Sequence, residues 1–112
     1  MDLQNKKIKR LKGKTKISEI YNASTVFKSD FLILRLIKNK EVQHLEVGVA
    51  VSKKNFKRAV DRNRVKRLLR EAVKKNENNI SFSGHCIFLY KGLHLPDLSI
   101  LVKEVHSLIK KV

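Results

Sequence analysis

The hydrophobic period of the chain changes near its middle, and this change restricts the possible folds more than any other feature. Between Leu45 and Val51 apolar side chains occupy every second position, which indicates a strand with one face in the core. From Ala59 to Lys75 they recur every three or four residues instead, at Val65, Leu68, Leu69, Ala72 and Val73. That spacing gives a helix a single apolar stripe. A strand followed by an amphipathic helix predicts mixed α and β structure.

The remaining segments supply further strands and helices. Apolar runs over Phe31–Ile37 and Cys86–Tyr90 predict two buried strands. A short helix fits Lys16–Ala23, and a last helix is expected to begin at Pro96 or Asp97. The apolar stripe of that last helix consists of Leu98, Leu101, Val102, Val105 and Ile109. The predicted fold class is α+β, a small sheet covered by helices.

The composition fits one intracellular domain. Of the 112 residues, 42% are hydrophobic, which is enough to form a core. With one proline and no Gly-rich or Pro-rich linker, we predict a single domain over residues 1–112, with residues 1–14 as a basic N-terminal arm. The single cysteine, Cys86, excludes an internal disulfide. No apolar run is long enough to span a bilayer, and residues 1–16 lack the apolar core of a signal peptide. We therefore expect a cytoplasmic protein without a membrane partner.

Positive charge is concentrated in two parts of the chain. Lys and Arg number 26 against 10 Asp and Glu, a formal net charge of +16. Residues 1–16 carry a net +6 and residues 53–75 a net +9, so the rest of the chain is nearly neutral. Phosphates attract Lys and Arg, and binding releases counterions. Nucleic acid is therefore the expected partner.

The helix predicted over residues 59–75 carries a basic face. Arg62, Lys66 and Arg70 follow at intervals of four, where like charges repel each other by roughly 0.2–0.5 kcal/mol per pair. Only Asp61 and Glu71 offset this charge. Arg67 or Arg70 could alternatively pair with Glu71 or Asp61 on the helix surface. A helix that needed only a solvated face would mix the signs. The segment is also rich in Arg, whose planar guanidinium suits bidentate phosphate contact, so the pattern indicates a helix that binds phosphate backbone.

The acidic residues and histidines do not form the pattern of a protein nuclease. Metal-dependent phosphodiester cleavage usually needs several carboxylates around one or two ions, but no two acidic residues lie two to four positions apart. A zinc site of His85, Cys86 and His94 is conceivable, yet the spacing fits no zinc class. Adjacent strand residues such as His85 and Cys86 would also point to opposite faces. We expect a buried structural Cys86, no catalytic residues and no metal bound by the protein.

One string of residues resembles the signature of a known family. Val51–Lys54 (VSKK) ends a predicted strand, Ala59 and Val60 begin the helix, and Arg62–Glu71 (RNRVKRLLRE) forms its basic part. In residue type and spacing this string resembles the signature of the bacterial ribonuclease P protein subunit. The element order and the chain length agree as well, so the resemblance covers essentially the whole chain.

The resemblance implies a fold and a function. The fold is a mixed sheet of about four strands in the order α-β-β-β-α-β-α, with a left-handed β-α-β crossover through the basic helix, a handedness that is rare elsewhere. Family members bind a large catalytic RNA, and the complex removes the 5′ leader from precursor tRNA. The RNA holds the Mg²⁺ ions and performs the hydrolysis. The protein subunit stabilises the RNA and holds the leader, with no obligate protein partner.

The resemblance also assigns two sites. The surface facing the catalytic RNA consists of Lys53, Lys54, Arg58, Arg62, Asn63, Arg64, Lys66, Arg67 and Arg70. The second site is a leader-binding cleft between the first helix and the sheet, with the candidates Ile17, Tyr21, Phe27 and Phe31. Aromatic rings suit this site because bases stack on them, and Ile17 stands where the family often has another aromatic residue. Phe27 and Phe31 could instead belong to the core, and Asn63 could make a purely structural hydrogen bond.

Two other functions stay open from the residues alone. A structural RNA-binding protein of the ribosomal type would share the charge and the size, but it would not need both a stacking cleft and a separate phosphate-binding surface. The second open function is that of a non-specific DNA-binding protein. DNA readers usually place short polar side chains against base edges, whereas this helix offers mostly Arg and Lys. Charge and periodicity by themselves reach only a nucleic-acid-binding α+β domain.

Overall fold

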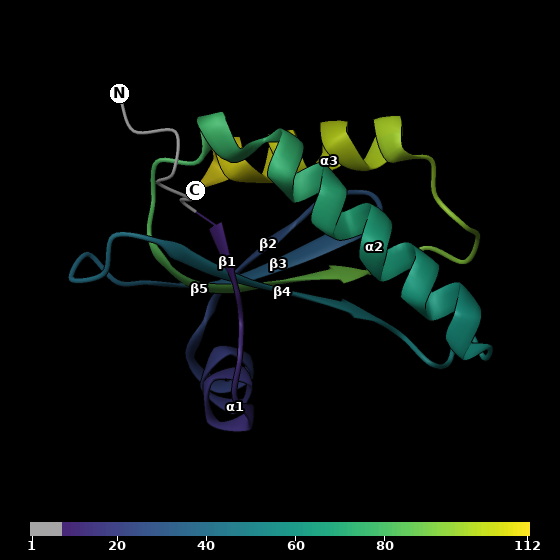
Figure 1. Cartoon of the computed structure of the whole chain (residues 1–112), viewed down its shortest axis with the longest axis horizontal. Helices are drawn as coiled ribbons and strands as arrows, with labels where there is room; N and C mark the ends of the chain where they lie inside the picture. Colours follow the sequence, from purple (N-terminus) through teal and green to yellow (C-terminus); the bar gives the residue numbers. More distant parts are fainter. Residues whose placement is uncertain (1–7) are drawn as a thin grey trace.

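A five-stranded sheet lies between two layers of helices in the computed structural model, which describes residues 8–112 (Figure 1). The elements are β1 (Ile8–Arg10), α1 (Lys14–Ala23), β2 (Thr25–Lys28), β3 (Leu32–Lys38), β4 (Leu45–Val51), α2 (Ala59–Lys75), a 3₁₀ turn (Glu77–Asn79), β5 (Gly84–Tyr90) and α3 (Leu98–Lys111). The helices α2 and α3 cover one face of the sheet and α1 covers the other. The α+β prediction is confirmed.

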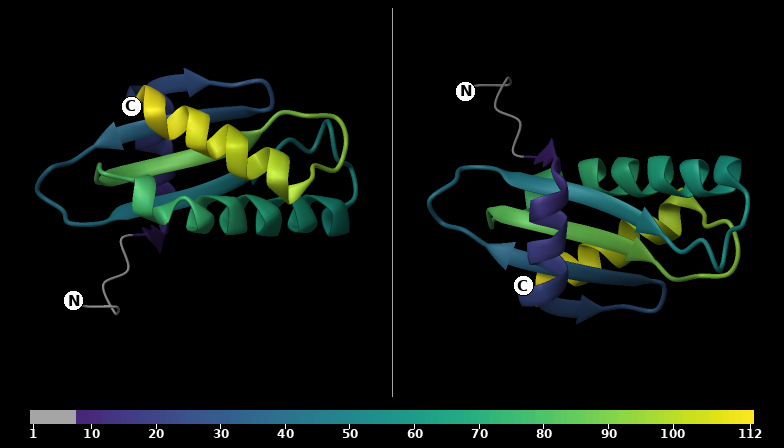
Figure 2. Two further views of the ribbon diagram at one scale, coloured as in Figure 1. Left: turned by 90° about the horizontal axis from the view of Figure 1, so that it is seen from above. Right: turned by 90° about the horizontal axis from the view of Figure 1, so that it is seen from below.

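The sheet is mixed, with the strand order β1-β4-β5-β3-β2. Strand β4 runs parallel to both of its neighbours, β1 and β5, whereas β3 is antiparallel to β5 and β2. The chain passes from β4 through α2 to the adjacent β5. Seen from the side of α2 with these two strands pointing upwards, β5 lies to the left of β4 (Figure 2, left), so the crossover has the expected left-handed sense.

The main core lies between the sheet and the layer of α2 and α3. The alternating residues Leu32, Leu34 and Leu36 of β3 are buried there. The apolar stripes predicted for the two helices face this core: Val65, Leu69, Ala72, Val73, Leu101, Val105 and Ile109 are buried, and Leu68, Leu98 and Val102 pack against them. The sequence period therefore identified the packing face of both helices.

The helix α1 packs on the opposite face of the sheet, over β3 and β5. Ile20 is fully buried in this position. Ile17, three residues earlier, remains 40% exposed. Tyr21, the next residue after Ile20, remains 44% exposed. The helix thus leaves two large side chains at its margin, beside the uncovered part of the sheet.

The predicted strand number needs correction, because part of the N-terminal arm belongs to the sheet. Residues 1–7 of the arm lie outside the described residues, but Ile8–Arg10 form β1 and pair with Leu45–Val47. The Leu11 N–H continues the ladder by donating to the Val47 carbonyl (2.9 Å). The sheet therefore has five strands, and the predicted order lacked β1. No helix within residues 8–112 is long and apolar enough to cross a membrane.

Candidate nucleic-acid interface

The helix α2 presents uncompensated positive charge to the solvent. Arg64, Arg67 and Arg70 are exposed. Within residues 8–112 neither Asp61 nor Glu71 forms an ion pair with them. The alternative in which these carboxylates neutralise the arginines is therefore not what the structure shows. Guanidinium groups in this state are available to the phosphates of a polyanion.

The predicted RNA-binding surface extends past the start of α2. Lys53 and Lys54 are exposed in the loop that leads from β4 to α2, and Arg58 is exposed at the N-cap of the helix. On α2 itself Asn63 is exposed and Lys66 is half-buried. The surface is therefore built from a loop and a helix, and its shape depends on how the loop is held.

Arg62 is the member of this predicted surface whose side chain turns back onto the protein. Its Nη1 donates hydrogen bonds to the carbonyl oxygens of Phe56 (2.9 Å) and Lys57 (2.8 Å). Phe56 is buried and its ring lies 6.0 Å from that of Tyr90. Arg62 and Phe56 together fix the end of the loop that carries Lys53.

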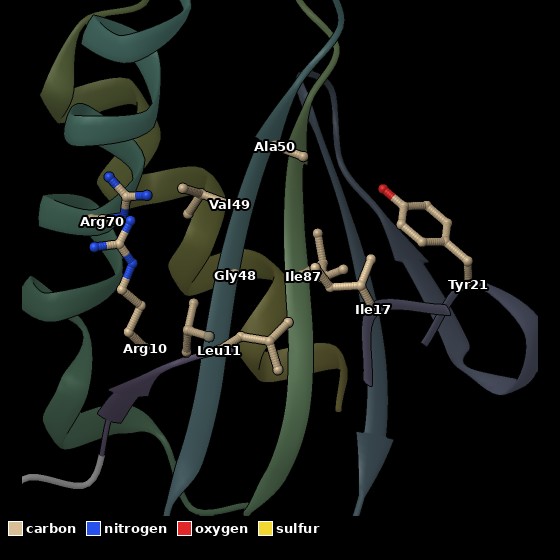
Figure 3. A pocket seen from close by; sticks show the side chains of 10 residues that line it. Arg10, Leu11, Ile17, Tyr21, Gly48, Val49, Ala50, Arg70 and Ile87 are labelled. Atoms are coloured by element: carbon tan, nitrogen blue, oxygen red, sulfur yellow. The ribbon is translucent and has the colours of Figure 1, made fainter. Parts of the chain in front are cut away.

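A groove of about 200 Å³ opens beside the sheet between α1 and α2 (Figure 3). Its lining consists of Arg10, Leu11, Ile17, Tyr21, Val47, Gly48, Val49, Ala50, Arg70 and Ile87. The groove exists because β1 pairs with β4 only as far as Val47. Beyond that residue, β4 pairs within residues 8–112 only with β5.

Gly48 allows the chain to pass closely over the floor of the groove. A Cβ atom at this position would lie 3.0 Å from Leu11 Cδ2 and 3.4 Å from Ile87 Cγ1. The Leu11 side chain lies across β4 in the space that a larger residue would fill. A glycine inside a strand often marks such a close approach, and the small residues of β4 were the sequence signal for it.

Two guanidinium groups lie side by side at one end of the groove. Arg10 comes from the end of β1 and Arg70 from α2, and Figure 3 shows their nitrogens next to each other. Partial burial, and then the charge of Arg10, lower the pKa of Arg70. Since no carboxylate of the described residues forms an ion pair with either group, the pair favours an anion such as a phosphate.

The other end of the groove is aromatic. Tyr21 projects from α1, and the guanidinium carbon of Arg35 in β3 lies 5.0 Å from the centroid of its ring. This distance is within the range of a cation–π contact. The groove thus joins a cationic end to a stacking end, an arrangement that suits single-stranded nucleic acid.

Two of the four residues predicted for the leader-binding cleft, Phe27 and Phe31, lie outside this groove. Phe27 pairs with Leu34 in the sheet and packs against the core under α3. The ring of Phe31 contacts that of Tyr90, a core residue, at 6.5 Å, and its N–H donates to the carboxylate of Glu104 in α3 (2.8 Å). Neither residue lines the groove, and only Ile17 and Tyr21 of the predicted set do.

Cys86 and its histidine neighbours form no metal site. Cys86 is fully buried in the core, where burial raises the pKa of its thiol. His85 lies on the other face of β5, with its Nδ1 3.0 Å from a carboxylate oxygen of Glu46. Among the described residues no three His, Cys, Asp or Glu side chains are gathered as a metal ion requires. The predicted burial of Cys86 is confirmed.

The sequence did not indicate two functional candidates, Arg10 and Arg35. Arg10 was one of many cations in the arm, and Arg35 was one charge inside an apolar run. Their importance comes from neighbours that are distant in sequence, namely Arg70 for the first and Tyr21 for the second. The interruption of the apolar run Phe31–Ile37 by a charge was the only available signal for Arg35.

Fold and site together define a small basic α+β protein with a groove suited to a polyanion. Comparison with known proteins is more specific, because the profile of the family described as Ribonuclease P matches residues 5–112. The chain therefore belongs to the ribonuclease P protein family.

Curated relatives agree with this membership. The chain is 39% identical over 80 residues to the ribonuclease P protein component of Coprothermobacter proteolyticus, covering 71% of this chain and 63% of that protein. It matches the corresponding protein of Pseudomonas aeruginosa at 32% identity, again over 63% of its length, so it spans less than two thirds of both relatives. With the Clostridioides difficile protein component it shares 30% identity over 92% of this chain and 90% of the relative.

Solved structures show the same fold. The RNase P protein of Thermotoga maritima superposes with a TM-score of 0.81 at 18% identity, covering 93% of this chain and 97% of that one. The RNase P protein of Staphylococcus aureus gives a TM-score of 0.77 at 24% identity, with 91% and 93% coverage. The mixed sheet and its helices are therefore those of this family.

Proposed function

We propose that this chain is the protein subunit of a cytoplasmic ribonuclease P ribonucleoprotein. It binds the catalytic RNA through α2 and the preceding loop, and it holds the single-stranded 5′ leader of precursor tRNA in the groove. The complex then removes the leader by Mg²⁺-dependent hydrolysis. Family membership supports the subunit role, and the groove that joins a cationic end to an aromatic end is the observation that carries the leader-binding role.

The two RNA-binding surfaces meet at Arg70. This residue belongs to the basic side of α2 and also lines the groove. A strand lying in the groove would place phosphates beside Arg10 and Arg70 and a base beside Tyr21. An RNA bound along α2 and a leader bound in the groove would therefore be neighbours, as a subunit that aligns substrate with catalyst requires.

Magnesium enters the proposal only through the RNA. The carboxylates of the described residues do not gather in a way that fits a Mg²⁺ ion, and no step assigned to the protein uses one. The protein supplies positive charge that offsets phosphate repulsion where RNA and substrate meet. That role explains how a chain with a net charge of +16 and no catalytic constellation assists a hydrolysis.

Reconstitution tests the proposal. The full chain is mixed with a bacterial ribonuclease P RNA and a precursor tRNA at low Mg²⁺, where the RNA alone is nearly inactive. Wild type should restore correct 5′ cleavage, and the Arg64→Ala/Arg67→Ala variant should lose most of this effect. The Lys103→Ala/Lys110→Ala variant removes the same charge from exposed positions of α3 and should retain it.

Leader length separates the groove from the helix surface. Tyr21→Ala should weaken binding of precursors with long leaders by roughly 5-fold or more, the effect of losing one stacked base, and leave leaderless tRNA unaffected. If the wild-type chain binds the RNA tightly but restores no cleavage, the protein is a structural RNA-binding protein and the proposal is wrong.

A further inference from the structure

We infer that Arg35 is a positioning residue of the groove. Its guanidinium holds the Tyr21 ring so that a single nucleobase stacks on the outer face of that ring. The inference rests on the proposed function, in which the groove receives single-stranded RNA. It adds Arg35 of β3 to that site and specifies that the site binds one base.

The geometry places Arg35 beneath the ring. Arg35 lies in β3, an interior strand of the sheet, paired with Val26 on one side and Ile87 on the other. Its guanidinium carbon is 5.0 Å from the Tyr21 ring centroid. Since Tyr21 belongs to the helix above this face, the guanidinium covers the ring face that is turned to the sheet. The ring remains 44% exposed, so its outer face is the one open to a ligand.

If only the stability of the fold mattered, an apolar residue would be favoured over Arg35 at this position. The neighbouring residues of β3 on this face are Ile33 and Ile37. The Arg35 Nε atom is buried without a hydrogen-bond partner, and no carboxylate within residues 8–112 forms an ion pair with this side chain. A buried donor without a partner destabilises a fold, whereas an apolar side chain would pack there without this cost. Such a local conflict is typical of a functional position.

The contact limits the aromatic end to one stacked base in the proposed site. A ring that is free on both faces can insert between two bases, but the sheet-facing side of Tyr21 is occupied by the guanidinium. The cation also orients the ring at a fixed height above the sheet. A base that stacks on the outer face thus meets a preorganised platform.

A binding experiment with the protein alone tests this role. Single-stranded RNA oligonucleotides carrying one 2-aminopurine report stacking as loss of fluorescence. Wild type should quench the probe, and Tyr21→Ala should abolish the quenching. Arg35→Met keeps the length of the side chain, and it should weaken oligonucleotide binding about 3- to 10-fold through loss of the cation–π contact. Arg35→Lys should recover part of the loss, and Lys38→Met on the same strand controls for net charge.

Two further readouts separate positioning from a structural role. The Tm of Arg35→Met should equal or exceed that of wild type, because the buried donor is removed, and the Tyr21→Ala/Arg35→Met variant should bind no more weakly than Tyr21→Ala alone. Unchanged quenching in Arg35→Met overturns the inference, as does a lowered Tm with additive losses. If Tyr21→Ala also leaves quenching unchanged, the strand does not bind in the groove and the leader-binding proposal itself fails.

Discussion

Arg10 and Arg70 bring two guanidinium groups together from distant parts of the chain, one at the end of the three-residue strand β1 and one in the second half of α2. Partial burial of Arg70, and then the charge of the nearby Arg10, lower the pKa of Arg70. The repulsion between them persists only because the fold holds β1 beside β4 under α2. An anion between the two groups would relieve it.

Phosphate and sulfate should therefore stabilise the protein more than chloride does at equal ionic strength. Occupancy at tenfold above the Kd adds about 1.4 kcal/mol, which raises the Tm of a domain of this size by roughly 5 °C or more. Differential scanning calorimetry in matched salts measures the shift. Arg10→Gln and Arg70→Gln should each reduce it, whereas Lys103→Gln on α3 should not. Equal Tm values in phosphate and chloride would show that the pair is not an anion site.

Arg62 provides a second prediction, because its two hydrogen bonds hold the loop before α2. Arg62→Gln should weaken RNA binding more than the loss of a single phosphate contact would. The slope of log K against log[salt] should nevertheless change by about 1 or less. The cause is displacement of the loop that carries Lys53. A double-mutant cycle between Arg62→Gln and Lys53→Ala should give a coupling of about 0.5 kcal/mol or more.

Arg58→Gln is the matched control for that cycle. Arg58 is exposed at the N-cap of the same helix, so its removal deletes a charge without releasing the Arg62 hydrogen bonds. Its effect should be additive with Lys53→Ala. Additivity of Arg62→Gln as well would mean that Arg62 contacts RNA directly rather than through the loop.

The elements that the sequence predicted correctly are those with a strong hydrophobic period. The stripes of α2 and α3 and the alternation of β4 each bury many side chains, so period and burial agree. Strand β1 could not be found in this way, since three residues with two positive charges have no period. It forms because β4 offers an open edge with which it can pair.

The candidate site was predicted in part, for reasons of register and distance. Phe27 was placed in the cleft, but its pairing with Leu34 turns it toward the core. A one-residue change of register reverses the face of every side chain in a strand, and a strand of four residues contains too little pattern to fix it. Arg35 was missed because only its position beneath Tyr21 gives it a role.

Gly84 is predicted to be indispensable for the start of β5. Its φ is +132°, and a Cβ atom there would collide with the Ile37 carbonyl oxygen and lie 2.8 Å from the Asn39 nitrogen. Both obstacles are backbone atoms in the sheet and its adjoining loop, so they cannot move aside cheaply. Gly84→Ala should lower the free energy of unfolding by about 2–4 kcal/mol, measured by urea denaturation.

Gly13 separates backbone strain from collision in that experiment. Its φ is also positive, at +98°, but a Cβ atom there would meet nothing within 4 Å. Gly13→Ala should therefore cost only about 1–2 kcal/mol, the price of the left-handed backbone conformation. Equal losses in the two variants would contradict the assignment of a collision at Gly84.

Tyr90 should make the stability of the fold depend on pH in the alkaline range. Its ring is buried in the core and its hydroxyl donates to the His94 carbonyl (2.7 Å). Burial, and then the nearby Glu104 carboxylate, raise the pKa of Tyr90 above its ordinary value of 10.0. Below that value the phenol is neutral in both the folded and the unfolded state, so its contribution to stability is fully present. As the pH rises through it, the unfolded chain releases the proton first, and the free energy of unfolding falls.

Tyr90→Phe isolates this effect from the titration of the many lysines. At neutral pH the variant should lose about 1 kcal/mol with the hydrogen bond to His94. Between pH 9 and pH 11 its stability should decline less steeply than that of wild type. Urea denaturation at a series of pH values supplies the two curves. Parallel curves for wild type and Tyr90→Phe across this range would show that Tyr90 keeps the same affinity for its proton when the protein unfolds.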